Sequence, residues 1–67
     1  MEVKLTDEIR NTWERFDWTD SWSEEQTKWL AENIKGNWAF WGMSGFIGST
    51  IWIENKHEAM LYRLRWM

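Results

Sequence analysis

The first half of the chain carries apolar side chains at intervals of three and four residues, which is the period of an α-helix. One such stripe consists of Leu5, Ile9, Trp13 and Phe16. Thr6 stands at a suitable N-cap position, and the acidic residues in the turn after it favour a helix start there. The pattern therefore predicts a first helix over residues 7–17.

Ser23 and Gln26 have the spacing of a capping box, so a second helix is predicted to begin after Ser23. Glu24 and Glu25 would complement the helix dipole, and Gly36 would end the helix. Its apolar face would comprise Trp29, Leu30 and Ile34. Residues 18–22, between the two helices, are then expected to form a short acidic turn.

After Gly36 the apolar period changes from 3.6 to two, which predicts a β-hairpin with strands 38–43 and 46–53 and with Gly45 in the turn. One face would carry Trp38, Phe40, Ile47, Ile51 and Ile53. The other face would carry Ala39, Trp41, Met43, Phe46, Gly48 and Trp52. A two-residue and a four-residue turn give the same faces, and the two-residue turn would place Trp41 across from Gly48, where a ring can lie over the missing side chain.

The last element is predicted to be a short amphipathic helix that begins at Asn55 and ends near Trp66. Asn55 and Glu58 again have capping-box spacing. The apolar face expected from the spacing consists of His57, Met60, Leu61 and Leu64.

Together these elements predict an α+β fold in a single domain over residues 1–67, in the order helix, helix, β-hairpin, helix. The helices would cover one face of the hairpin, and the other face would stay partly open. Two strands alone make a marginal sheet. We therefore expect a homodimer, in which a second copy would complete the sheet.

Composition strengthens the expectation of a binding surface. Eight tryptophans, three phenylalanines and one tyrosine make up 18% of the 67 residues, more than so small a core can enclose. The chain has no cysteine and one histidine, so we expect no disulfide, no metal site and no cofactor. The uncharged stretch 37–53 could approach the length of a membrane span, but its polar residues and alternation favour a sheet.

Charge is unevenly distributed along the chain. Residues 1–35 contain nine acidic and five basic residues, whereas residues 36–67 contain two acidic and three basic residues, and the net charge is -3. Nucleic acid is therefore not an expected partner. The acidic residues closest to one another in the sequence are Asp17, Asp20, Glu24 and Glu25. Interleaved with tryptophans, they suit either a solvated face or a patch that docks onto a basic surface.

No catalytic residues emerge from the sequence. Ser44 lies in a GMSG stretch that lacks the spacing of a nucleophile elbow. The glycines at 42 and 45 are flanked by predicted strands, whereas a phosphate-binding loop needs a helix after it. His57 has acidic neighbours that helix-start preferences already explain. We expect a protein that is not an enzyme.

The C-terminal stretch "TIWIENKHEAMLYRLRWM" resembles the ends of many small accessory proteins of tailed bacteriophages. These proteins close with an aromatic strand, a polar cap and a helix that ends in Arg-Trp. The resemblance implies a host-takeover or anti-defence factor that acts by binding, in the cytoplasm of an infected bacterium. It brings no catalytic residues with it.

Two hypotheses of function follow. The first is a protein that inhibits a host macromolecule, and its expected partner-binding residues are Trp41, Met43, Phe46, Trp52, Asp17, Asp20, Glu24 and Glu25. The alternative is a protein that binds or sequesters a nucleotide, because aromatic rings stack on bases and arginines pair with phosphate. Its expected ligand-binding residues are Tyr62, Arg63, Arg65 and Trp66.

Overall fold

The computed structural model describes residues 1–21, 23–42 and 47–67, and for residues 20, 21 and 47 it describes the backbone alone. Within these residues the elements follow the order α1 (Asp7–Thr12), β1 (Glu14–Ser21), α2 (Glu24–Asn33), β2 (Trp38–Trp41), β3 (Ile47–Ile53) and α3 (Lys56–Trp66). The strands form one antiparallel sheet in the order β1-β3-β2. The predicted α+β class is confirmed.

The first predicted helix is wrong in its second half. α1 ends at Thr12, Trp13 is its C-cap, and residues 14–21 form β1, including part of the predicted acidic turn. Phe16 fits both a helical stripe and a strand in which apolar and charged residues alternate. Pairing with β3 decides between them, because Phe16 lies opposite Ile51 and is 4% exposed. The sheet thus gains a third strand from the chain itself.

The two strands of the predicted hairpin pair as expected, with a shifted register. Trp41 lies opposite Thr50, not opposite Gly48. The shift is two residues, so both predicted faces of the hairpin are preserved. The observed register needs a glycine at position 42, since a Cβ at Gly42 would lie 2.5 Å from the Ser49 hydroxyl oxygen. The predicted turn at Gly45 lies outside the described residues.

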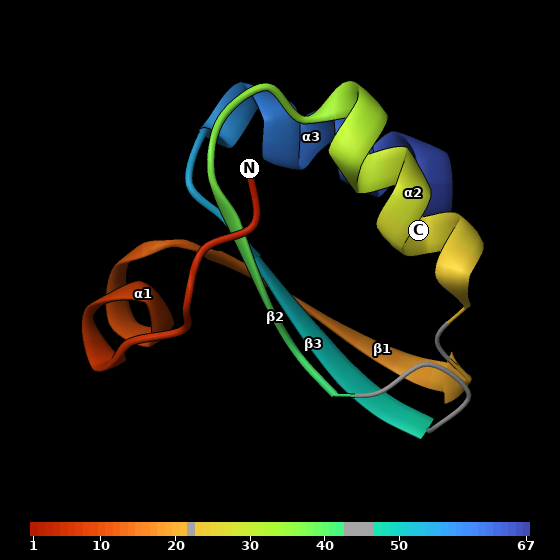
Figure 1. The fold of residues 1–67 in the computed structure, drawn as a ribbon, viewed down its shortest axis with the longest axis horizontal. Coiled ribbons are helices and arrows are strands. Elements are labelled where there is room, and N and C mark those ends of the chain that lie inside the picture. The colour runs from red at the N-terminus through yellow and green to blue at the C-terminus, as the bar shows by residue number, and fades with distance from the viewer. Residues whose placement is uncertain (22, 43–46) are drawn as a thin grey trace.

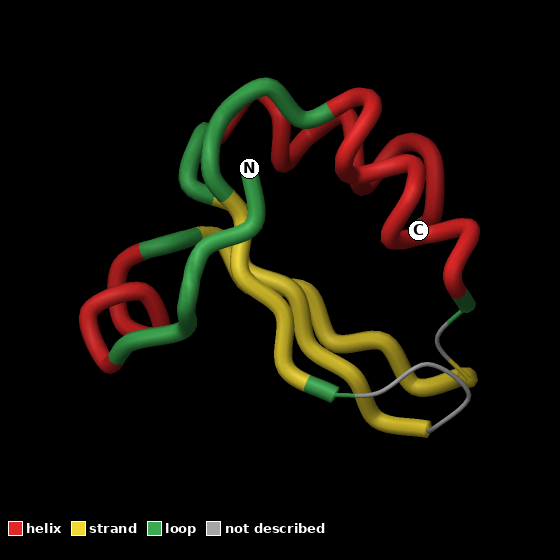
Figure 2. Tube along the Cα trace, viewed as in Figure 1, coloured by secondary structure: helices red, strands yellow, loops and turns green. Residues whose placement is uncertain are grey.

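Helices α2 and α3 cover one face of the sheet, as Figures 1 and 2 show. The buried residues of this layer are Phe16, Leu30, Ile34, Trp38, Ile51, Ile53, Ala59 and Tyr62. Half-buried aromatic rings extend this core toward the C-terminus of α3. The ring of Trp66 makes edge-to-face contacts with Trp18 and Trp29, both at 6.3 Å between centroids. Such pairs contribute about 0.5–1.5 kcal/mol each beyond their buried area.

The opposite face of the sheet is partly covered by the N-terminal segment and α1. Trp52 is only 2% exposed and packs with Ile9 and Ala39. The backbone of residues 1–3 pairs with Trp38 at the outer edge of β2, because Val3 N–H donates to the Trp38 carbonyl at 2.8 Å. The expectation that Trp52 lies on an open face is therefore wrong, and the cover comes from residues that precede the sheet in sequence.

The buried face of α3 differs from the predicted one. Ala59 and Tyr62 are buried, whereas Met60, Leu61 and Leu64 are exposed. The helix carries two apolar stripes, and the stripe with the tyrosine ring fills the space above Phe16, with 4.9 Å between the ring centroids. None of the helices in the described parts of the chain is long and apolar enough to cross a bilayer.

Candidate interaction surface

The outer face of α3 is the most apolar exposed helix surface that the structure describes. We define it by Met60, Leu61 and Leu64, which are 60%, 41% and 79% exposed. Residues three and four apart lie on one side of a helix, so these side chains form a continuous strip. Met67, directly after the helix, is also exposed. The inner stripe of α3 fills the core, and the strip lies outside it.

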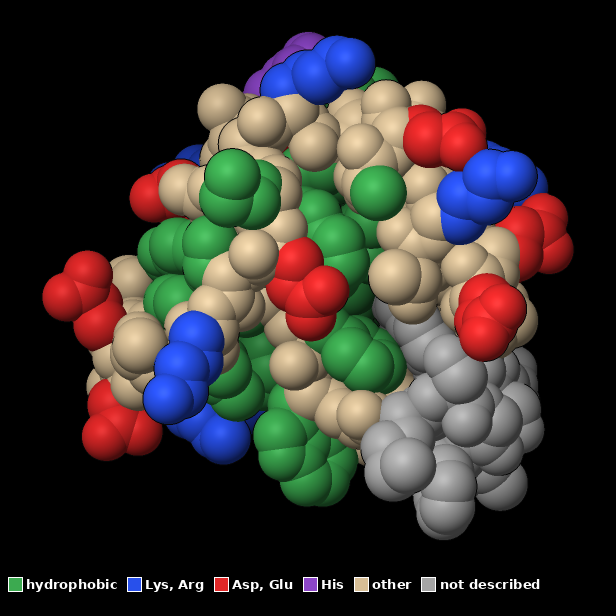
Figure 3. All heavy atoms as spheres, viewed as in Figure 1, with side chains coloured by type: hydrophobic (Ala, Val, Ile, Leu, Met, Phe, Trp, Pro, Cys, Tyr) green, Lys and Arg blue, Asp and Glu red, His purple; other side chains and the backbone are tan. Residues whose placement is uncertain are grey.

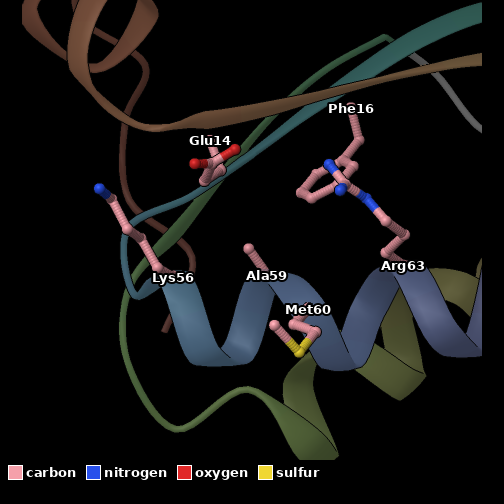
Figure 4. Close-up of a pocket in the computed structure, with 6 residues that line it drawn as sticks. All are labelled: Glu14, Phe16, Lys56, Ala59, Met60 and Arg63. Atoms are coloured by element: carbon pink, nitrogen blue, oxygen red, sulfur yellow. The ribbon is translucent and has the colours of Figure 1, made fainter.

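A groove of about 210 Å³ lies beside this face, between α3 and β1. It is lined by Glu14, Phe16, Lys56, Ala59, Met60 and Arg63. Figure 4 shows these side chains coming from the two elements, with Phe16 and Arg63 next to each other. The groove therefore joins the outer face of α3 to the outer edge of the sheet.

Cations flank the apolar strip. Arg63 places its guanidinium carbon 5.3 Å from the centroid of the Phe16 ring, and Arg65 places its own 4.3 Å from the Trp66 ring. Both contacts are within cation–π range, so each arginine is held against an aromatic ring while remaining exposed. Lys56 adds a further exposed cation at the start of the helix. The surroundings of the strip therefore favour a partner with negative charge.

Three of the four acidic residues predicted as a docking patch are described, and they lie on two different elements, β1 and α2. Asp17 lies on the sheet face away from α2 and α3, where it accepts hydrogen bonds from Thr50 Oγ1 at 3.0 Å and Arg15 Nε at 3.1 Å. Glu24 and Glu25 are exposed in the first turn of α2. Figure 3 shows acidic side chains scattered over the visible surface. The side chain of Asp20 lies outside the described residues.

Two of the four predicted aromatic and apolar anchors, Trp41 and Trp52, are described by the structure. Trp41 is 56% exposed on the sheet face opposite α2 and α3. Trp52 is buried, with the guanidinium carbons of Arg10 and Arg15 at 5.7 Å and 5.8 Å from its ring. Met43 and Phe46 lie outside the described residues.

The predicted nucleotide site is divided between different sides of α3. Tyr62 is wholly buried, and burial raises the pKa of its hydroxyl to about 12. Residues two apart on a helix point in different directions, so Arg63 lies against Phe16 and Arg65 against Trp66. Trp66 is half-buried in the aromatic cluster. The four side chains therefore do not converge on a ligand.

The parts of the chain that the structure describes contain no metal-binding cluster. No group of three or more His, Asp or Glu side chains there could hold a metal ion. His57 is exposed near the start of α3. Ser44 lies outside the described residues.

The predictions from sequence missed the outer face of α3 as a surface, because they assigned its residues to the core. A signal was present, since apolar residues surround most of this helix, and a helix that is apolar on several sides has more than one face to bury.

No protein-family model, no curated protein and no solved structure matches this chain.

Proposed function

We propose that this chain is a non-enzymatic binding protein that docks onto a protein partner through the outer face of α3. The observation that carries the proposal is the exposure of Met60, Leu61 and Leu64 on a helix whose other stripe completes the core. Burying one such side chain stabilises a complex by about 1.5–3 kcal/mol. Large contiguous apolar patches on a surface are typical of contact sites.

The partner that suits this surface is an apolar helix or groove with an acidic rim. Lys56, Arg63 and Arg65 surround the strip, and they would attract negative charge before contact is made. If the chain is a phage accessory protein, as its C-terminal residues suggest, the partner would be a host protein in the cytoplasm of the infected bacterium. The outcome for the host protein would be inhibition by masking its surface.

The experiment is capture of partners from bacterial lysate by the tagged chain, identified by mass spectrometry, with two matched variants. Leu61→Ser with Leu64→Ser removes the strip at exposed positions, so the fold should survive. Trp41→Ser removes the exposed tryptophan from the other side of the molecule. We expect a protein captured by the wild type and by the Trp41 variant to be at least about tenfold depleted with the α3 variant.

Other results would contradict the proposal. If the protein is no longer captured by Trp41→Ser but is still captured by the α3 variant, binding would be assigned to the sheet face that carries Trp41. Equal capture by all three proteins, or no specific capture by any of them, would remove the outer face of α3 as a docking surface. Circular dichroism of each variant establishes that the chain is folded before capture is compared.

A further inference from the structure

β1 is an edge strand with a charge pattern of its own. The sheet order β1-β3-β2 leaves one side of β1 without a neighbouring strand among the described residues. The opposite edge differs, because residues 1–3 pair with Trp38 on β2. An edge strand presents unpaired backbone N–H and C=O groups that can pair with another strand. At eight residues, β1 is also the longest strand described.

We propose that two copies of this chain pair through the outer edges of β1, antiparallel and with Phe16 on the two-fold axis. The occupant of the edge is thus a second copy, and the argument for it is charge complementarity along the strand. The inference does not rest on the proposed docking by α3, because its contacts are made by the backbone of β1 and by the side chains of Arg15 and Asp17.

Symmetry limits the registers that such a pair can adopt. In an antiparallel pair whose copies present the same sheet face, the two-fold axis passes midway between one residue of β1 and the same residue of the second copy. If the axis passes through Arg15, two arginines face each other, and if it passes through Asp17, two carboxylates do. Like charges directly opposite each other are destabilising. Both of these registers are disfavoured.

In the register centred on Phe16, opposite charges face each other. Arg15 of each copy lies directly opposite Asp17 of the second copy, so the pair of strands contains two such contacts. Opposite residues in an antiparallel pair have Cβ atoms about 4.5–5.5 Å apart, and an opposite-charge pair contributes roughly 0.2–1 kcal/mol there. The edge of β1 is therefore complementary to itself in this register.

The side chains concerned are available for these contacts. Arg15 and Asp17 have 58% and 61% of their side-chain surface exposed. Within one chain, Arg15 Nε and Thr50 Oγ1 both donate to Oδ1 of Asp17. A carboxylate has two acceptor oxygens and a guanidinium five N–H donors, so Oδ2 and the terminal Arg15 nitrogens can serve the second copy. The result would be a ring of four alternating charges on one face of a six-stranded sheet.

Charge exchange between two variants tests the pairing. Asp17→Arg leaves two cations on the strand and Arg15→Asp leaves two anions, so each variant alone should lose the dimer. Mixing the two variants restores both opposite-charge contacts in one heterodimer. By sedimentation, we expect the wild type and the mixture to reach twice the 8.3 kDa mass of the chain, and each variant alone to stay at that mass.

Cross-linking tests the register itself. The chain has no cysteine, so Arg15→Cys and Asp17→Cys introduce unique thiols. Residues directly opposite across antiparallel strands have a Cα separation that a disulfide can span. Under mild oxidation the mixture of the two variants should form mainly the 15–17 cross-link, and Arg15→Cys alone should form little. A wild type that is monomeric at all concentrations, or failure of mixing to restore the dimer, would overturn the proposal. Preferential cross-linking of position 15 to 15 or of 17 to 17 would overturn the register.

Discussion

The carboxylate of Glu58 in the first turn of α3 accepts a hydrogen bond from the backbone N–H of Gly36, which follows the end of α2, at 3.0 Å. Its second oxygen accepts from the Lys35 N–H at 2.6 Å. The sequence predicts Glu58 as part of a local capping box, and the Asn55 half of that motif is confirmed, since Asn55 Oδ1 accepts from Glu58 N–H. The Glu58 side chain instead joins two helices that are 22 residues apart in sequence.

Replacing this carboxylate should therefore destabilise the fold. Glu58→Gln puts an amide NH₂ group where an oxygen accepts an N–H, and it removes the charge that strengthens both hydrogen bonds. We expect a loss of about 1–3 kcal/mol in the free energy of unfolding. Urea unfolding followed by circular dichroism measures it. Glu32→Gln, at an exposed position of α2, is the matched control and should change stability by less than about 0.5 kcal/mol. Equal effects would contradict the role assigned to Glu58.

Tyr62 should remain protonated well above the usual range of a phenol. Burial raises its pKa from 10.0 to about 12, and it is the only tyrosine of the chain, so phenolate absorbance reports this residue alone. We expect a midpoint near pH 12 in the folded protein and near 10 in denaturant. A folded-state midpoint near 10 would contradict the burial of Tyr62.

The same shift predicts a dependence of stability on alkaline pH. Because the folded pKa is above the unfolded pKa, the contribution of Tyr62 is complete below pH 10 and is lost as pH rises from 10 to about 12. The titration of one group changes the free energy of unfolding by at most about 1.4 kcal/mol per pH unit. Urea unfolding at several pH values should show a smaller alkaline loss for Tyr62→Phe than for the wild type. If the free energy of unfolding fell equally with pH in both proteins, the ionisation of Tyr62 would not account for the alkaline loss of stability.

The two tryptophans on the sheet face opposite α2 and α3 should differ sharply in their effect on stability. Trp52 is 2% exposed and Trp41 is 56% exposed. We expect Trp52→Ala to cost about 3–5 kcal/mol and Trp41→Ala less than about 1 kcal/mol. Thermal unfolding of both variants by circular dichroism decides the point. A Trp41 variant as unstable as the Trp52 variant would place Trp41 in the core.

Gly42 should tolerate alanine less well than Gly48. Both have positive φ, at 139° and 88°, so alanine strains the backbone at either site. A Cβ at Gly42 would in addition meet Ser49, whereas a Cβ at Gly48 would have no atom within 4 Å. We expect each variant to lose about 1 kcal/mol or more, with the larger loss at Gly42. The reverse order in urea unfolding would contradict the packing around Ser49.

Local signals explain which parts of the fold could be predicted from sequence. Thr6, Ser23 and Asn55 precede α1, α2 and α3 as predicted, because capping depends on residues three positions away. The extent of α1 depended on Phe16, whose spacing fits a helix as well as a strand. Pairing with β3, which is distant in sequence, decides between helix and strand, and the local pattern around Phe16 carries no information about that pairing.

The same reason accounts for the error in α3 and in the candidate surface. Met60, Leu61 and Leu64 have a helical spacing as good as that of Ala59, Tyr62 and Trp66. Which stripe turns inward is decided by the space above Phe16 and by the position of α2. Spacing within the helix reveals neither of these, so the sequence prediction placed Met60, Leu61 and Leu64 in the core.

The pairing of residues 1–3 with Trp38 has a consequence for how the protein behaves when concentrated. A sheet with two open edges can add copies at both sides without limit, as amyloid fibrils do. Here residues 1–3 cap one side of the sheet at Trp38, and under the proposed pairing the other side takes one neighbour. Growth would then terminate at a pair, and deleting residues 1–3 would open a route to polymerisation.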